Sequence, residues 1–118
     1  MHSKWLPSLL IGIGLAVSSS AQASGSASGL ITYFVPFVSG GVEMFAVRLT
    51  TMSTLPACNT ATRFVMSAAD PKFRTTVAAL LGAHFSGTSI FIHGQGTCTT
   101  YDNASEDLAY ICLGTDPC

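Results

Sequence analysis

Apolar side chains in the second half of the chain recur with the period of a helix. Within residues 70–87 the positions of this stripe follow one another at intervals of four, three, one and three residues. They are Phe73, Val77, Leu80, Leu81 and His84. This spacing places them on one stripe of a helix of about four turns. We therefore expect a single helix here, with its stripe packed against a core and His84 at the edge of the stripe.

Residues with known end preferences flank this stripe. Ser67 or Asp70 can cap the first turn, and Pro71 suits a first turn that needs no amide donor. Gly87 can take the left-handed conformation that ends many helices. The sequence thus predicts both ends of the helix.

Elsewhere the pattern is that of strands. Five short runs are rich in β-branched and aromatic residues, and they span 30–38, 42–51, 62–66, 88–93 and 108–113. The glycines of Ser39-Gly40-Gly41 tolerate a positive φ, so this segment predicts a hairpin turn between the first two runs. In the second run Phe45, Val47 and Leu49 share one face. The opposite face holds Met44, Ala46 and Arg48.

Three predicted strands precede the helix and two follow it. This order is that of the OB-fold, a five-stranded, partly open Greek-key barrel. We therefore expect a mainly β protein whose one helix lies between strands three and four and plugs an open end of the barrel. The alternative is a small α+β sheet with the helix on one face, because element order does not fix strand pairing.

The N-terminal segment has the features of a signal peptide. Lys4 precedes an apolar stretch over residues 5–17, and Ala21-Gln22-Ala23 supplies the small residues of a cleavage site. The apolar stretch is shorter than the run of about 20 residues that spans a membrane, and glycines interrupt it. The sequence predicts a signal peptide at 1–23, with an uncleaved anchor as the alternative.

The predicted mature chain, residues 24–118, suffices for one domain. Its first residues, 24–28, are Gly, Ser and Ala, which predicts a flexible mature N-terminus. A single OB-fold domain is expected over 29–118. The protein is expected to be exported by a bacterium, to the periplasm or beyond it, without stable membrane insertion after cleavage.

The charge of the chain argues against one class of partner. The whole chain has a formal net charge of −1, and loss of Lys4 with the signal peptide leaves −2. Phosphate binding requires clustered Lys and Arg side chains, so we expect no nucleic-acid partner. So few charges leave much neutral surface, which is compatible with a subunit interface.

Four cysteines lie in the predicted mature part. An even count in an exported chain predicts two disulfides, with three possible pairings, among Cys58, Cys98, Cys112 and Cys118. We favour a bond between Cys58, before the third strand, and Cys98, after the fourth. The other two cysteines can close a small C-terminal loop. A zinc site is the alternative, but the cysteines lack paired short spacings, and we expect neither a metal nor a cofactor.

Candidate catalytic side chains carry no local signature. His84 and His93 could act as bases. Their candidate partners are Ser86, Ser89 and Asp102. Because no nucleophile elbow or similar motif accompanies them, we expect a protein that is not an enzyme. The carboxylates of Asp102, Glu106 and Asp107 could serve a glycosidase, but such an acidic loop before a strand is expected to be flexible and solvated.

A long polar loop is the candidate binding region. It spans residues 94–107 and contains four candidate ligand-binding residues, Thr99, Tyr101, Asp102 and Asn103. Polar groups around a tyrosine can hydrogen-bond sugar hydroxyls while the ring stacks on the sugar. The alternative is an ordinary polar surface loop that Cys98 attaches to the domain.

A series of short motifs resembles one family. In chain order they are Phe45-Ala-Val-Arg-Leu, Pro56-Ala-Cys58, Arg63-Phe-Val-Met, Asp70-Pro-Lys-Phe73, Ala79-Leu-Leu-Gly-Ala83, Ser86-Gly87, Ile90-Phe-Ile92 and Gly96-Thr-Cys98. From Gly29 to Leu113 the chain resembles small exported bacterial proteins similar to the B subunit of subtilase cytotoxin.

This resemblance implies an OB-fold, a disulfide joining Cys58 to Cys98, and kinship with the ring-forming, glycan-binding subunits of pertussis-like toxins. By the same resemblance the protein would form a homo-oligomer, a pentamer. The toxin subunits bind sialylated glycans with a serine and neighbouring polar and aromatic residues, and no sugar-binding residue is carried over from them to this chain. The pair of Cys112 and Cys118 is an addition to the family's usual C-terminal end.

Three hypotheses follow. The first is an exported, non-catalytic binding module that recognises a glycan or a partner protein. The second is a stand-alone periplasmic structural or interaction protein without a sugar site. A small hydrolase is the reserve.

Overall fold

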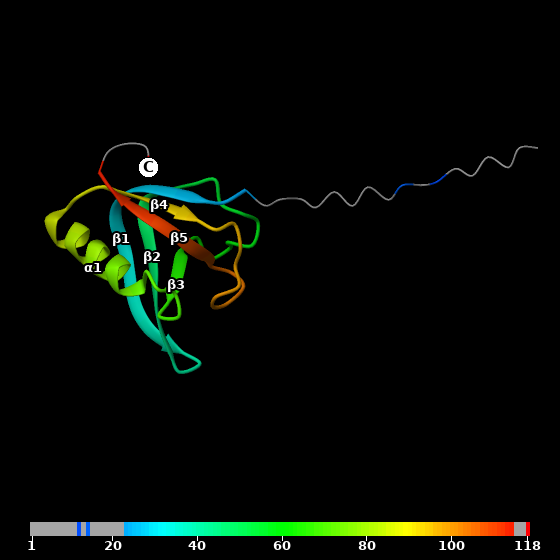
Figure 1. Cartoon of the computed structure of the whole chain (residues 1–118). Helices are drawn as coiled ribbons and strands as arrows, with labels where there is room; N and C mark the ends of the chain where they lie inside the picture. Colours follow the sequence, from blue (N-terminus) through cyan, green and yellow to red (C-terminus); the bar gives the residue numbers. More distant parts are fainter. Residues whose placement is uncertain (1–11, 13, 15–22, 115–117) are drawn as a thin grey trace, which may run out of the picture.

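The computed structural model describes residues 12, 14, 23–114 and 118 (Figure 1). The predicted signal peptide lies almost wholly outside these residues. The elements are β1 (Ser26–Ser39), β2 (Val42–Ser53), β3 (Phe64–Ser67), α1 (Phe73–Ser86), β4 (Ile90–Gly94) and β5 (Glu106–Leu113). The described chain is therefore mainly β, with its helix between the third and fourth strands as the sequence predicted.

The five strands form a ring in the order β1-β2-β3-β5-β4. Neighbouring strands are antiparallel except for β3 and β5, which are parallel. This is the strand order of the OB-fold, so the predicted fold is confirmed and the alternative of an open sheet is wrong. The contact between β3 and β5, which we call the β3–β5 seam, has the fewest paired residues of the ring. Phe64 pairs with Glu106 there, and Val65 pairs with Asp107.

Strand β1 closes the ring by pairing on both sides. Its first four residues pair with β4, and the strand pairs with β2 along most of its length. The register shifts on either side of Ile31, just after Gly29, whose φ is 109°. A Cβ atom on Gly29 would collide with Oγ1 of Thr50, so glycine is required where the strand bends. The hairpin formed with β2 extends beyond the rest of the barrel (Figure 1).

The predicted flexible N-terminus at 24–28 is wrong from Gly25 onward. Gly25 is buried, β1 begins at Ser26, and Ala27 is 1% exposed within the core. Small side chains carry little strand propensity, but β2 and β4 supply backbone partners on both edges of this segment. The domain therefore begins before Gly29.

The core is formed by inward-facing strand side chains and one face of α1. Phe45, Val47 and Leu49 of β2 face it, as the alternation predicted. The helix contributes Leu80 and Ala83 to the same cluster. Two partly buried helix side chains, Phe73 and Val77, pack against the cluster. The helix stripe was thus predicted in part, since Thr76 and Ala83 are buried whereas Leu81 and His84 are exposed.

The helix ends differ in how well they were predicted. Gly87 is the C-cap with φ 65°, as expected, and the Thr88 amide donates to the carbonyl of Ala83 over 3.0 Å. Neither Ser67 nor Asp70 caps the helix, which begins at Phe73 after Lys72. Asp70 Oδ1 instead accepts from the Lys72 amide over 2.8 Å and caps the turn before the helix.

Both favoured disulfides are present. One joins Cys58 to Cys98 and the other joins Cys112 to Cys118, with Cα separations of 6.0 Å and 6.1 Å. The first links the loop between β2 and β3 to the loop between β4 and β5. Disulfides persist in oxidising compartments, so they indicate an exported location. No helix in the described part of the chain is long and apolar enough to cross a membrane.

Candidate functional site

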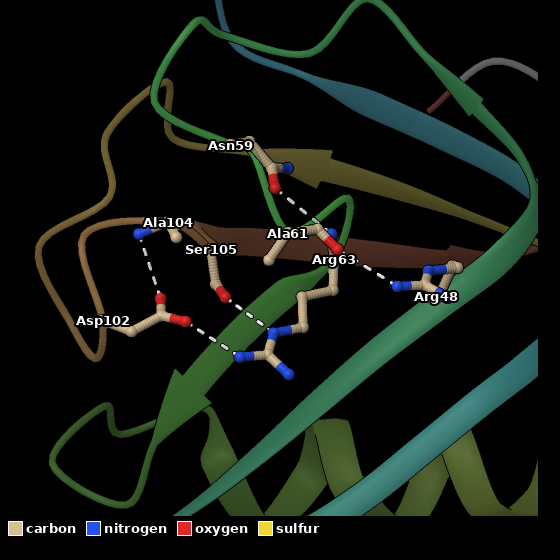
Figure 2. Close-up of polar contacts among 7 residues, drawn as sticks. All are labelled: Arg48, Asn59, Ala61, Arg63, Asp102, Ala104 and Ser105. Carbon is tan, nitrogen blue, oxygen red and sulfur yellow. Dashed lines mark hydrogen bonds and ion pairs between the residues drawn. The ribbon is translucent and has the colours of Figure 1, made fainter.

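Two loops meet beside the β3–β5 seam. The β2–β3 loop, residues 54–63, and the β4–β5 loop, residues 95–105, are joined by the disulfide between Cys58 and Cys98. The Ala61 amide also donates to the Ala104 carbonyl over 2.9 Å. Figure 2 shows the polar contacts that surround this junction.

Arg48 projects from β2 and holds the end of the β2–β3 loop. Its Nε donates to the Thr62 carbonyl over 2.7 Å. Its Nη2 donates to the Ala61 carbonyl over 3.1 Å, the contact drawn in Figure 2. Thr62 has φ 55°, a left-handed conformation that is rare for a β-branched residue. Such strain persists only where the surroundings impose it, and the Arg48 side chain is part of what imposes it here.

Arg63 connects the two loops through its side chain. Its Nε donates to Ser105 Oγ over 2.7 Å, and its Nη2 lies 2.8 Å from Asp102 Oδ2 (Figure 2). Asp102 Oδ1 also accepts from the Ala104 amide over 3.0 Å. Because the side chains of Arg63 and Asp102 are 23% and 27% exposed, solvent reaches the pair.

The contacts between Arg63 and Asp102 favour the charged form of each. Burial would lower the pKa of Arg63, but hydrogen bonds with Asp102 and Tyr33 raise it above its ordinary value. Burial would raise the pKa of Asp102, but bonds from the Ala104 amide and Arg63 hold it below its ordinary value. Both groups therefore remain ionised at neutral pH.

Arginine and aromatic side chains alternate across the outer side of β1, β2 and the β4–β5 loop. The guanidinium carbon of Arg48 lies 5.3 Å from the ring centroid of Tyr33, and that of Arg63 lies 5.7 Å from the ring centroid of Tyr101. The Tyr101 ring meets Phe37 edge-on at 4.8 Å between centroids. We call these five residues the arginine–aromatic face. Tyr101 is 40% exposed, and the other four side chains are partly exposed, so polar and aromatic groups lie together at the surface here.

Asp107 organises the first half of the β4–β5 loop. Its carboxylate accepts from the hydroxyls of Thr97 and Thr99 over 2.6 Å and 2.9 Å. It also accepts from the amides of Thr99 and Thr100 over 3.1 Å and 2.9 Å. Burial would raise the pKa of Asp107, but these hydrogen bonds hold it below its ordinary value. The loop is therefore built around a buried anion and held in one shape.

The acidic residues at the start of β5 correct one expectation. Glu106 is 0% exposed and Asp107 is 4% exposed, so neither belongs to a solvated, flexible loop. Asp102 is exposed, but it is paired with Arg63. Backbone amides enclose the two buried carboxylates, an arrangement that sequence alone does not reveal.

The structure divides the four predicted ligand-binding residues into two pairs. Tyr101 and Asp102 both contact Arg63 at the arginine–aromatic face. Thr99 and Asn103 instead line an open hollow of about 530 Å³ beside the first disulfide. The other residues that line this hollow are Cys58, Gln95, Gly96, Thr97 and Cys98.

A second, apolar cavity lies between the β1–β2 hairpin and α1. Its volume is about 420 Å³. The lining is apolar apart from one carboxylate, and it consists of Phe34, Pro36, Phe37, Val38, Glu43, Met44, Phe45, Phe73, Val77 and Leu81. Phe85, one helical turn beyond Leu81, is 83% exposed. This side of the molecule thus offers a hydrophobic surface next to the cavity.

The two histidines do not form the pairs that a hydrolase would need. His93 is stacked at 4.6 Å on Tyr110 and lies 4.9 Å from Phe91, all on the β4–β5 surface. His84 lies against Phe85 on α1. Within residues 23–114 no hydrogen bond joins either histidine to a candidate partner. The same described residues contain no cluster of three His, Cys, Asp or Glu side chains that could hold a metal ion.

The sequence analysis did not predict four members of the face, namely Tyr33, Phe37, Arg48 and Arg63. Arg48 had a signal, since the alternation of β2 placed it opposite the core-facing side chains. The other three had none, because their neighbours in space lie far along the chain.

Comparison with known proteins adds no relative to this picture. No protein-family model matches the chain, and no curated protein matches it at a significant level.

Proposed function

We propose that the protein is an exported, disulfide-stabilised, non-catalytic binding module that recognises a glycan at the arginine–aromatic face. The observation that carries the proposal is the alternation of Arg48, Tyr33, Arg63, Tyr101 and Phe37 beside the β4–β5 loop. In OB-folds the surface of strands two and three and the loop between strands four and five is the usual binding surface for oligosaccharides and oligonucleotides. The negative charge of the mature chain disfavours the latter ligand.

The chemistry of this face suits a sugar. Aromatic rings supply flat apolar area for the C–H face of a sugar ring, and guanidinium and carboxylate groups supply donors and acceptors for its hydroxyls. The disulfide at Cys58, the Asp107 carboxylate and the bonds of Arg63 hold the loop before a ligand arrives. A preorganised site loses less conformational entropy on binding, which favours useful affinity from a small surface.

Glycan arrays test the proposal. We expect the oxidised chain 24–118 to bind a defined subset of glycans, and Tyr101→Ala to weaken binding about tenfold or more, because the exposed ring is lost. Tyr110→Ala is the matched control, since Tyr110 is a similarly exposed tyrosine on β5, stacked on His93. Silent arrays, or equal losses in both variants, would contradict a sugar site at this face.

The resemblance to toxin B subunits extends the proposal to a ring-shaped homo-oligomer. Size-exclusion chromatography with light scattering on oxidised and reduced protein measures this directly. A particle of pentamer mass supports a toxin-like ring, whereas a monomer favours a stand-alone module in the periplasm.

The apolar cavity favours a second candidate, an interaction protein that holds an apolar side chain of a protein partner. Val38, which lines the cavity from the hairpin, and Phe85, on the helix that forms the other wall, are both exposed. In that case Leu81→Arg, at the cavity wall, should abolish capture of the partner from a periplasmic extract, and Tyr101→Ala should leave capture intact. The reverse pattern would remove this candidate.

A further inference from the structure

A buried carboxylate outside the binding face has one oxygen that no described residue contacts with a hydrogen bond. Glu106, at the start of β5, is 0% exposed. Its Oε2 accepts from the amide of Gly25 over 2.7 Å and from the amide of Gly96 over 3.0 Å. Its Oε1 is buried and accepts no hydrogen bond from the described residues.

No side chain of the described residues forms an ion pair with this carboxylate. Within the described part of the chain, the ion pairs are Arg63 with Asp102 and Lys72 with Asp70. A buried anion that has neutral donors only is costly compared with one that also faces a cation. A positive group close to Oε1 would therefore stabilise the fold.

The Oε1 atom of Glu106 lies next to Gly25, the residue before β1. A Cβ atom on Gly25 would collide with Oε1, and it would lie 3.1 Å from the Thr54 carbonyl. Gly25 is buried, whereas Ser24 before it is exposed. The nitrogen of Ser24 precedes that of Gly25 by one residue, which is at most about 3.6 Å of chain.

We propose that removal of the signal peptide completes this site, with the new α-ammonium of Ser24 pairing with Glu106. This inference rests on the export that forms part of the proposed function, because the small residues of Ala21-Gln22-Ala23 place the cleavage after Ala23. Hydrolysis breaks the bond between the Ala23 carbonyl carbon and the Ser24 nitrogen. The oxygen of water goes to the departing carboxylate, and the nitrogen gains protons to become an ammonium.

Processing then changes the electrostatics of the barrel entrance. In the precursor the Ser24 nitrogen is a neutral amide with one hydrogen. In the mature chain the Ser24 nitrogen carries a positive charge and three hydrogen-bond donors beside the Glu106 carboxylate. The ion pair then stabilises the position of the first residues of β1. The mature protein is accordingly more stable than its precursor.

A double-mutant cycle tests the pair without any ligand. The chain 24–118 is prepared with a free α-amine and with an Nα-acetyl group, each with Glu106 and with Glu106→Gln, and unfolded in urea. Acetylation should raise the unfolding equilibrium constant about tenfold with Glu106 present and less than about twofold with Glu106→Gln. Equal effects of acetylation in the two backgrounds would overturn the proposal.

Two further measurements keep the test decisive. If Glu106→Gln does not fold, the ¹³C resonance of the Glu106 carboxylate is compared between the free and acetylated chains. A clear shift supports the pair and an unchanged resonance overturns it. The N-terminal residue of exported protein, found by mass spectrometry, tests the cleavage site separately, so failure of export and failure of the ion pair are distinguishable.

Discussion

Replacement of Cys58 and Cys98 by serine should lower the free energy of unfolding by about 4 kcal/mol, since this bond closes a loop with a sequence separation of 40. The loss should be larger than chain entropy alone predicts if the β2–β3 and β4–β5 loops also separate in the native state. Urea unfolding of oxidised protein, followed by circular dichroism, measures the difference.

The second disulfide provides the control. It joins residues only six apart, so Cys112→Ser with Cys118→Ser should cost about 2 kcal/mol by the same loop-closure argument. Glycan binding should survive this change and fall in the first variant, because of the two disulfides it is the Cys58–Cys98 bond that attaches the binding loop. Equal losses of stability in the two variants would contradict the role given to the first bond.

Asp107→Asn should destabilise the protein by about 2–3 kcal/mol, the range for hydrogen bonds to a charged acceptor. The amide keeps the shape of the carboxylate, but its NH₂ group cannot accept from the donors of Thr97, Thr99 and Thr100. We expect faster hydrogen exchange of the amides in the β4–β5 loop. Asp70→Asn, in the turn before α1, is the control and should cost less than about 1 kcal/mol.

The same substitution should change the response to acid. The pKa of Asp107 is held below its ordinary value in the folded protein. The carboxylate therefore contributes fully to the free energy of unfolding at pH values above the pKa of Asp107 in the unfolded chain, near 3.8. The contribution is lost as the pH falls from there through the lowered pKa. Urea titrations below pH 5 should therefore show a shallower loss of stability in Asp107→Asn, and parallel curves would rule out this role. Asp70 and Asp102, whose pKa values are also lowered, contribute to the remaining slope.

The fold could be predicted because its main elements have local signals. The apolar period of the helix and the left-handed stop at Gly87 are properties of adjacent residues, and both are present in the structure. The start of β1 could not be predicted in this way. Ala27 is buried because two distant strands pair with its backbone, and its own side chain carries little information.

The candidate site was predicted only where one loop contains it. Tyr101 and Asp102 stood out as polar and aromatic neighbours in a long loop, whereas their contact with Arg63 spans about forty residues of sequence. Burial of Glu106 and Asp107, the first two residues of β5, was missed for a related reason. Charged residues are almost never fully buried unless partners compensate them, and here the partners are backbone amides of glycines and threonines that no side-chain pattern reveals.

The narrow β3–β5 seam has a consequence for solubility. Two pairs of residues hold β3 and β5 together there. The Cys58–Cys98 disulfide and the contacts of Arg63 lie beside these pairs. If the bond is reduced and the seam parts, the ring becomes an open sheet with two unpaired edges, and such edges are templates for strand addition between molecules. We therefore expect the reduced protein to aggregate more readily than the oxidised protein, because the Cys58–Cys98 bond would help to keep these strand edges paired.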